Sequence, residues 1–150
     1  MSPLRWIEAS NDDESALLAL METFYREEKL VFSETKARAA VKKLLARTEL
    51  GQAFLLKDGA GEAHGHLVLT FGFSLEFQGR FVLLDEIFVS APMRGRGYGK
   101  EAIELAARWT REHGVAALRL EMTRANEHAR AVYLGRNFKD DGRDLLTRWV

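Results

Sequence analysis

The 150-residue chain is long enough for one domain with a hydrophobic core, and 47% hydrophobic with 29% charged residues is ordinary for a globular protein. The formal net charge at pH 7 is zero, so no global field attracts nucleic acid or an anionic membrane, and we expect neither as a partner. The lack of cysteine excludes a disulfide framework, a thiolate metal site and a covalent acyl-cysteine intermediate. Met1–Ser10 holds no apolar signal core, and no apolar run approaches about 18 residues, which predicts a cytoplasmic protein.

The N-terminal third predicts a short strand and two helices. Leu4–Ser10 has the character of a strand, and the polar residues after it supply an N-cap. Apolar residues then recur at helical spacing over 12–26 and again over 33–48. Ser33 is expected to cap the second helix, and Gly51 to end it.

The remaining pattern alternates strands with two more helices. Glycine-containing turns at 58–62 and 78–80 separate the first of these segments. The predicted strands are Gln52–Lys57, Ala63–Phe73, Phe81–Val89, Ala116–Met122 and Leu145–Val150, and the predicted helices are Lys100–His113, which Gly114 ends, and Asn126–Asn137. The order βααβββαβαβ predicts a single α/β (α+β) domain with a mixed, mostly antiparallel central sheet.

A glycine-rich loop, Arg94–Lys100, lies between a predicted strand and a predicted helix. Its sequence R-G-R-G-Y-G-K combines backbone freedom with positive charge. Glycine tolerates positive φ and lets a backbone approach a ligand closely, while the N–H groups at a helix N-terminus attract anions. We interpret the loop as a phosphate or pyrophosphate site; the alternative is a flexible turn with solvated arginines.

Two other phosphate motifs are tested against the same loop. A P-loop is excluded, because Glu101 follows Gly99-Lys100 and the position five before Gly99 is Arg94. The dinucleotide fingerprint fits Gly97-x-Gly99-x-x-Ala102, with Glu121 at the expected distance. Only about 30 residues follow Glu121, which is too short for the second half of a dinucleotide fold. An NAD-linked oxidoreductase is therefore a distant alternative.

Spacing across the second half of the chain favours a third interpretation. Arg94-x-x-Gly97-x-Gly99 is an R/Q-x-x-G-x-G/A motif, entered through Val89-Ser90-Ala91-Pro92. Asn126 and Tyr133 follow, seven positions apart, and Gly135 and Phe138 come after them. Together these residues resemble the GNAT superfamily of N-acetyltransferases, which use acetyl-CoA, over residues 82–138. Arg136-Asn137 directly before Phe138 departs from the family, which has a glycine at that point.

The resemblance implies a cofactor site and a sheet with a splayed strand pair. It assigns the CoA pyrophosphate to the loop backbone, namely Arg94, Gly95, Arg96, Gly97, Tyr98, Gly99 and Lys100. It assigns the pantetheine arm to the strand residues Ile87, Phe88 and Val89. By the same resemblance Asn126 contacts the arm or the acceptor, and Tyr133 lies near the sulfur and protonates the leaving thiolate. No metal is expected.

Three acidic residues are candidates for the base that deprotonates the acceptor. Asp85 and Glu86 interrupt an apolar strand, where a desolvated carboxylate becomes a stronger base. Relatives carry their acid or histidine nine positions before the loop arginine, which is Asp85, our first candidate. Glu86 is then expected on the opposite face, paired with an arginine, unless a bulge shifts the register. Glu121, twelve before Tyr133, is the third candidate.

The sequence leaves the acceptor open. Glu27 and Glu28, in the connection that overhangs the acceptor site in the family, favour a cationic small molecule or a peptide amine, acetylated directly in a ternary complex. A catalytically silent CoA-binding module is the alternative function, and a homodimer is common in the family. His64 and His66 are interpreted as exposed strand residues, because no third metal ligand with suitable spacing is visible.

Overall fold

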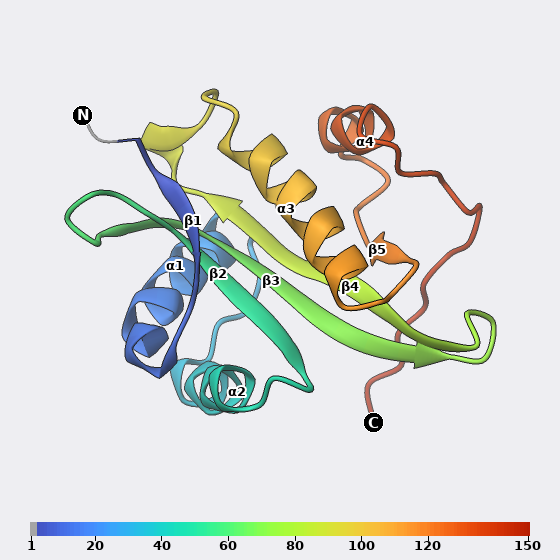
Figure 1. Ribbon diagram of the computed structural model, residues 1–150, viewed down its shortest axis with the longest axis horizontal. Coiled ribbons are helices and arrows are strands. Elements are labelled where there is room, and N and C mark those ends of the chain that lie inside the picture. Colours follow the sequence, from blue (N-terminus) through green and yellow to red (C-terminus); the bar gives the residue numbers. More distant parts are fainter. Residues whose placement is uncertain (1–2) are drawn as a thin grey trace. The chain divides into compact units, whose positions relative to one another are not determined.

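The computed structural model describes residues 3–150, which form two compact units, one ending at Leu120 and one covering Glu121–Val150. The first unit contains a five-stranded sheet in the order β1-β2-β3-β4-β5 (Figure 1). Its strands are β1 (Arg5–Glu8), β2 (Gly51–Lys57), β3 (Ala63–Ser74), β4 (Gly79–Val89) and β5 (Leu118–Leu120). The first three pairings are antiparallel and β4–β5 is parallel, which confirms the predicted mixed, mostly antiparallel sheet.

Three helices cover the two faces of this sheet (Figure 1). α1 (Glu14–Glu27) and α2 (Glu34–Ala46) pack on one face, and α3 (Tyr98–Glu112) packs on the other. The first face buries Leu17, Leu18, Met21, Val41, Ala53, Leu55 and Val68. The second buries Phe54, Leu67, Leu69, Val82, Leu84, Ala102, Ala106, Trp109 and Val115. Alternate side chains of one sheet thus supply both cores.

Local sequence signals explain most helix ends. A short 3-10 turn (Asn11–Asp13) opens α1, where Ser10 and Asp13 form a capping box. The Ser33 hydroxyl accepts from the first turn of α2, as predicted. Gly51 does not end α2, which stops at Ala46. It opens β2 instead, at a φ of 148° and so close to Leu69 that a Cβ would lie 2.0 Å from the carbonyl oxygen of that residue.

A β-bulge in β4 changes which face each side chain meets. Val68 of β3 opposes Glu86 and the next residue, Leu69, opposes Leu84, so Asp85 is the extra residue. Before the bulge, Val82 and Leu84 pack into the core beneath α3. After it, the even-numbered side chains lie on the other face, which carries α1. Glu86 and Phe88 contact α1 residues there.

The second unit holds one helix, α4 (Glu127–Leu134), whose N-cap is Asn126. The predicted strand at 145–150 is wrong, because these residues form no strand in the structure. Leu146 and Trp149 are about nine-tenths exposed, at 90% and 91%. The segment has the apolar residues that strands favour, but a strand forms only where a neighbour supplies hydrogen bonds.

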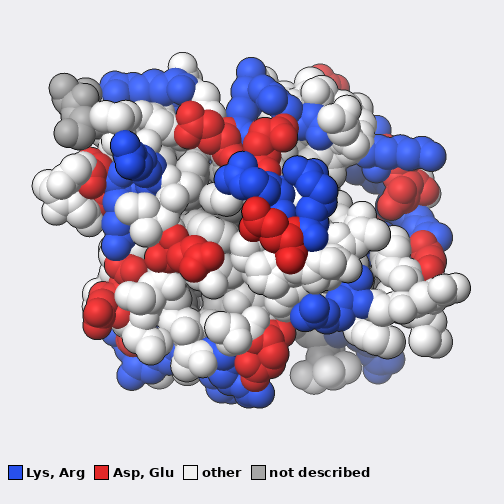
Figure 2. Space-filling model, in the orientation of Figure 1, with Lys and Arg blue, Asp and Glu red and all other residues white. Residues whose placement is uncertain are grey.

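Two smaller boundaries also differ from the prediction. β5 covers three residues of the predicted strand 116–122. The hairpin between β3 and β4 turns at 75–78, not at 78–80, because both strands extend towards its tip. None of the helices in residues 3–150 is long and apolar enough to cross a membrane. Acidic and basic side chains are intermixed over the face that Figure 2 shows, in keeping with the zero net charge.

Candidate active site

The candidate site begins where β5 leaves β4. β5 pairs only with Val82, Leu83 and Leu84, so within the unit that ends at Leu120 the rest of β4 has no strand on that side. The Ser90 N–H donates to the His64 carbonyl oxygen of β3, with an N–O distance of 2.8 Å. N–H groups alternate along a strand, so those of Ile87 and Val89 point to the opposite edge. An extended ligand can add to this edge as a further strand would.

The bulge places Glu86 against α1 and β3. Its Oε2 accepts from the Tyr25 hydroxyl at 2.5 Å, and its Oε1 lies 2.9 Å from His66 Nε2. The Glu86 side chain is 11% exposed and that of His66 is fully buried. Burial, and then the hydrogen bond and negative charge of Glu86, raise the pKa of Tyr25 well above its ordinary value. Tyr25 therefore stays a protonated donor at neutral pH.

Asp85 and Glu86 have different surroundings. Asp85, the extra residue of the bulge, is exposed, whereas Glu86 is largely buried. The expected arginine partner of Glu86 is wrong: a tyrosine and a histidine take that place. The expectation that His66 is exposed is also wrong. Sequence reasoning missed Tyr25 and His66 as site residues, although a histidine within an apolar strand was a usable signal.

The backbone conformation of the glycine loop explains two of its glycines and leaves the third unexplained. Gly95 and Gly97 have φ values of 76° and 89°, where side chains are strained. Gly99 lies outside that region, and a Cβ built on it meets nothing within 4 Å. The fold therefore gives no reason for Gly99 to lack a side chain, whereas a ligand lying against the first turn of α3 does. The absence of a side-chain cap on that turn fits an anion at the same place.

The basic residues of the loop divide into two groups. Arg94 turns back towards the sheet, where its Nε donates to the Val89 carbonyl at 2.8 Å and its guanidinium pairs with Glu27 at 2.7 Å. Arg96 and Lys100 are exposed. Arg94 therefore fixes the loop to the end of β4, and the two exposed cations remain for an anionic ligand.

Tyr98 anchors the start of α3 to the N-terminal strand. The Trp6 indole N–H donates to the Tyr98 carbonyl at 3.1 Å, and the Leu4 N–H lies 3.5 Å from the Tyr98 hydroxyl. These contacts join segments more than 90 positions apart in the chain, at sequence separations of 94 and 92. The loop thus has both ends tied to the sheet, which orders the backbone N–H groups before a ligand arrives.

The second unit carries the other predicted residues. The Asn126 side chain accepts from the Ala129 N–H at 3.1 Å and so caps α4, a structural role that the sequence analysis did not foresee. Tyr133 packs on Phe138 with ring centroids 5.6 Å apart, and burial raises its pKa. Glu121 is exposed. The assignments of Asn126, Tyr133 and Glu121 to the reaction stay predictions.

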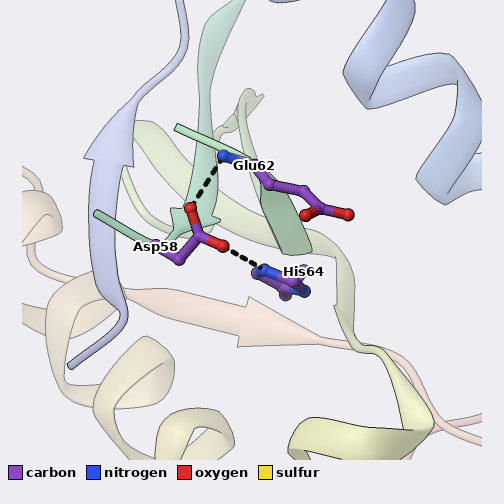
Figure 3. Close-up of side chains that lie close together, drawn as sticks. All are labelled: Asp58, Glu62 and His64. Carbon is purple, nitrogen blue, oxygen red and sulfur yellow. Dashed lines mark hydrogen bonds and ion pairs between the residues drawn. The ribbon is translucent and has the colours of Figure 1, made fainter. Parts of the chain in front are cut away.

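A second polar cluster lies at the turn between β2 and β3 and comprises Asp58, Glu62 and His64 (Figure 3). One Asp58 oxygen accepts from the N–H groups of Ala60 and Glu62, and the other lies 2.9 Å from His64 Nε2. The contact with His64 comes first among the causes that lower the pKa of Asp58. The sequence analysis identified no third metal ligand near His64, whereas the structure brings Asp58 and Glu62 to it. Since both Asp58 oxygens already serve the turn, we assign this cluster to the hairpin.

Comparison with solved structures identifies the fold as that of an acetyltransferase. A possible acetyltransferase from Clostridium difficile 630 superposes with a TM-score of 0.87 at 17% identity, over 99% of each chain. An aminoglycoside N-acetyltransferase in complex with CoA superposes at 0.84 and 17% identity, over 99% of this chain and 96% of that one.

A more similar sequence is an integron cassette protein from the mobile metagenome of Cole Harbour Salt Marsh. It is 32% identical, with a TM-score of 0.85, over 97% of this chain and 90% of that one. A search of curated protein sequences finds no significant match. Residues 16–138 match the acetyltransferase (GNAT) family, so the chain belongs to the GNAT acetyltransferase family.

Proposed function

We propose that the protein transfers the acetyl group of acetyl-CoA to a primary amine by direct attack in a ternary complex. The observation that carries this proposal is the continuous run from Ile87 to Lys100. It joins a strand edge with outward N–H groups to a glycine loop at an uncapped helix N-terminus. These two features suit the two parts of CoA, an amide-containing arm and a pyrophosphate.

The residues of this run would hold the cosubstrate. The edge N–H groups of Ile87 and Val89 would pair with the arm, and the backbone of Gly97–Lys100 would face the pyrophosphate. Bound acetyl-CoA supplies an activated thioester carbonyl. In the reaction a new C–N bond forms as the C–S bond breaks, and an outward N–H such as that of Ile87 would stabilise the charge that develops on the carbonyl oxygen.

Proton removal is assigned to the two carboxylates at the bulge. Only the free amine is nucleophilic, so an acceptor that arrives as an ammonium ion must first lose a proton. Glu86 is largely buried and contacts the side chains of Tyr25 and His66, which supports it over the exposed Asp85 as the base, directly or through water. Glu121 remains the third candidate.

The acceptor proposed is a cationic small molecule or a peptide or protein amine. Support comes from the carboxylates of Asp85 and Glu86 on one strand. Glu27 is withdrawn from the acidic set that suggested this class, because it already pairs with Arg94. The aminoglycoside acetylated by one structural neighbour is an amine of the same charge class.

A thermal-shift comparison, followed by a thiol-release assay, tests the proposed function. The melting temperature should rise with CoA and not with NAD at equal concentration. At a hundredfold excess of CoA over its Kd, the free energy of unfolding should increase by about 2.7 kcal/mol. Acetyl-CoA with a panel of amines should then release thiol at the rate of amide formation. CoA binding without turnover across a broad panel would instead support a catalytically silent module.

Tyr133→Phe tests the predicted acid. The variant should lower kcat by about 10–100-fold with little change in CoA affinity, because the leaving thiolate loses its proton donor. Burial raises the pKa of Tyr133, so the phenol keeps its proton at neutral pH and can act as an acid. The measurement compares kcat for acetyl-CoA with kcat for an acetyl thioester of a more acidic thiol, which needs less help from a proton donor to leave. An equal loss with both thioesters would contradict the assignment.

A further inference from the structure

We propose that His66 and Tyr25 are positioning residues for the reaction: by contacting both oxygens of the Glu86 carboxylate they hold it in one orientation. This inference rests on the proposed acetyl transfer with Glu86 as the base. Neither residue belongs to the glycine loop or to the strand edge, and each reaches Glu86 from a separate element, β3 and α1.

The contacts of His66 suit one tautomer of its ring. Nε2 lies 2.9 Å from Glu86 Oε1, while Nδ1 is buried without a hydrogen-bond partner in the part of the chain that the structure describes. A proton on Nε2 is donated to the carboxylate and leaves Nδ1 as a weak acceptor without a partner. The other tautomer would bury an N–H donor at Nδ1 without an acceptor, which is unfavourable.

Aromatic side chains fix the orientation of that ring. Phe24 meets His66 edge to face at a centroid distance of 5.8 Å, and Phe88 lies 5.7 Å away. Glu86 is therefore the polar partner of a fully buried imidazole that is otherwise surrounded by aromatic rings. A histidine that served packing alone would not need a carboxylate, whereas a carboxylate that must keep one orientation gains from a rigid donor.

Tyr25 supplies the second donor on the other carboxylate oxygen. Its hydroxyl lies 2.5 Å from Oε2, and its ring packs on Phe24 and Phe32 at 5.7 and 5.6 Å. Each carboxylate oxygen has two acceptor positions, so one on each oxygen remains for an incoming proton. Two donors on different oxygens fix the plane of the Glu86 carboxylate and so the direction from which the acceptor can approach it.

Other charged groups near this carboxylate lie on its own strand and at the start of the loop. Asp85 precedes Glu86 in β4, and its negative charge acts on Tyr25. Arg94, paired with Glu27 of α1, lies 5.6 Å from the Phe88 ring centroid.

Variants of the two residues test the proposal. Tyr25→Phe and His66→Leu should each lower kcat about tenfold or more and displace the acidic limb of the pH–rate profile, because each removes a direct contact with the carboxylate. CoA affinity should stay unchanged. His66→Gln, which keeps an N–H donor, should recover part of the rate.

Controls separate positioning from packing and from the proposed function itself. Phe32→Leu alters packing against Tyr25 without touching Glu86, so it should lower the melting temperature and leave the pH limb in place. An active wild type with the same pH limb in Tyr25→Phe and His66→Leu would overturn the positioning roles. A wild type that binds CoA and acetylates no amine would overturn the proposed function first. The titration of Glu86 followed by carboxyl NMR, with and without the Tyr25 hydroxyl, then decides whether that hydroxyl acts on the carboxylate.

Discussion

Glu86→Gln is expected to lower kcat for amine acetylation by about a hundredfold or more near neutral pH, with CoA binding close to that of the wild type. Glutamine keeps the size of the side chain and can still accept from the Tyr25 hydroxyl. It cannot take a proton from the acceptor. The loss should shrink as the pH approaches the pKa of the amine, because the acceptor then arrives unprotonated.

Asp85→Asn is the matched control for that experiment, because it changes the neighbouring acid in the same bulge. Asp85 is exposed and Glu86 is held by two donors, so we expect the smaller effect at Asp85. The measurement is kcat against pH for both variants with one amine. A large loss in Asp85→Asn beside a near-normal Glu86→Gln would return the base to Asp85 and contradict our reading of the contacts.

Gly99→Val is expected to weaken CoA binding by about 10–100-fold while leaving the fold intact. A Cβ at this position meets no atom from other parts of the described chain within 4 Å, and the backbone there is not in the left-handed region. A side chain inside the first turn of a helix also costs the fold less than glycine does. Among the residues that the structure describes nothing lies beside that Cβ, so the expected obstruction is to a ligand against the turn.

Calorimetric titration with CoA and thermal melting would measure the two effects separately. Gly99→Ala should fall between the wild type and Gly99→Val, because the obstruction grows with side-chain size. Gly97→Ala makes a contrasting pair: its φ of 89° strains any side chain, so it should lose stability as well as affinity. Unchanged CoA affinity in Gly99→Val would remove this loop from the pyrophosphate site.

The elements that depend on local sequence were predictable, and those that depend on pairing were less so. The caps at Ser10 and Ser33 and the glycine loop before α3 are visible in short stretches of sequence. The strand expected at 145–150 failed, because its apolar residues say nothing about whether a partner edge exists.

The candidate site divides in the same way. The loop and the two acids were found from sequence, because glycine spacing and carboxylates in an apolar run are conspicuous there. The surroundings of Glu86 were not, since they depend on a bulge, on a histidine 20 positions away and on a tyrosine 61 positions away. Regular alternation places Leu84 and Glu86 on one face, and the structure places them on opposite faces.

The bulge also bears on how this protein tolerates changes in length. One extra residue in β4 places Leu84 in the core under α3 and Glu86, two positions later, on the face beside α1. Deleting Asp85 would keep Leu84 opposite Leu69 and Glu86 opposite Val68, and it would restore regular pairing. Each half of the strand would keep the face that it has, because directly successive strand residues point to opposite faces. At this place in the chain, the extra residue therefore sets the local bend of the strand, and its loss would leave the chemistry on the same side of the sheet.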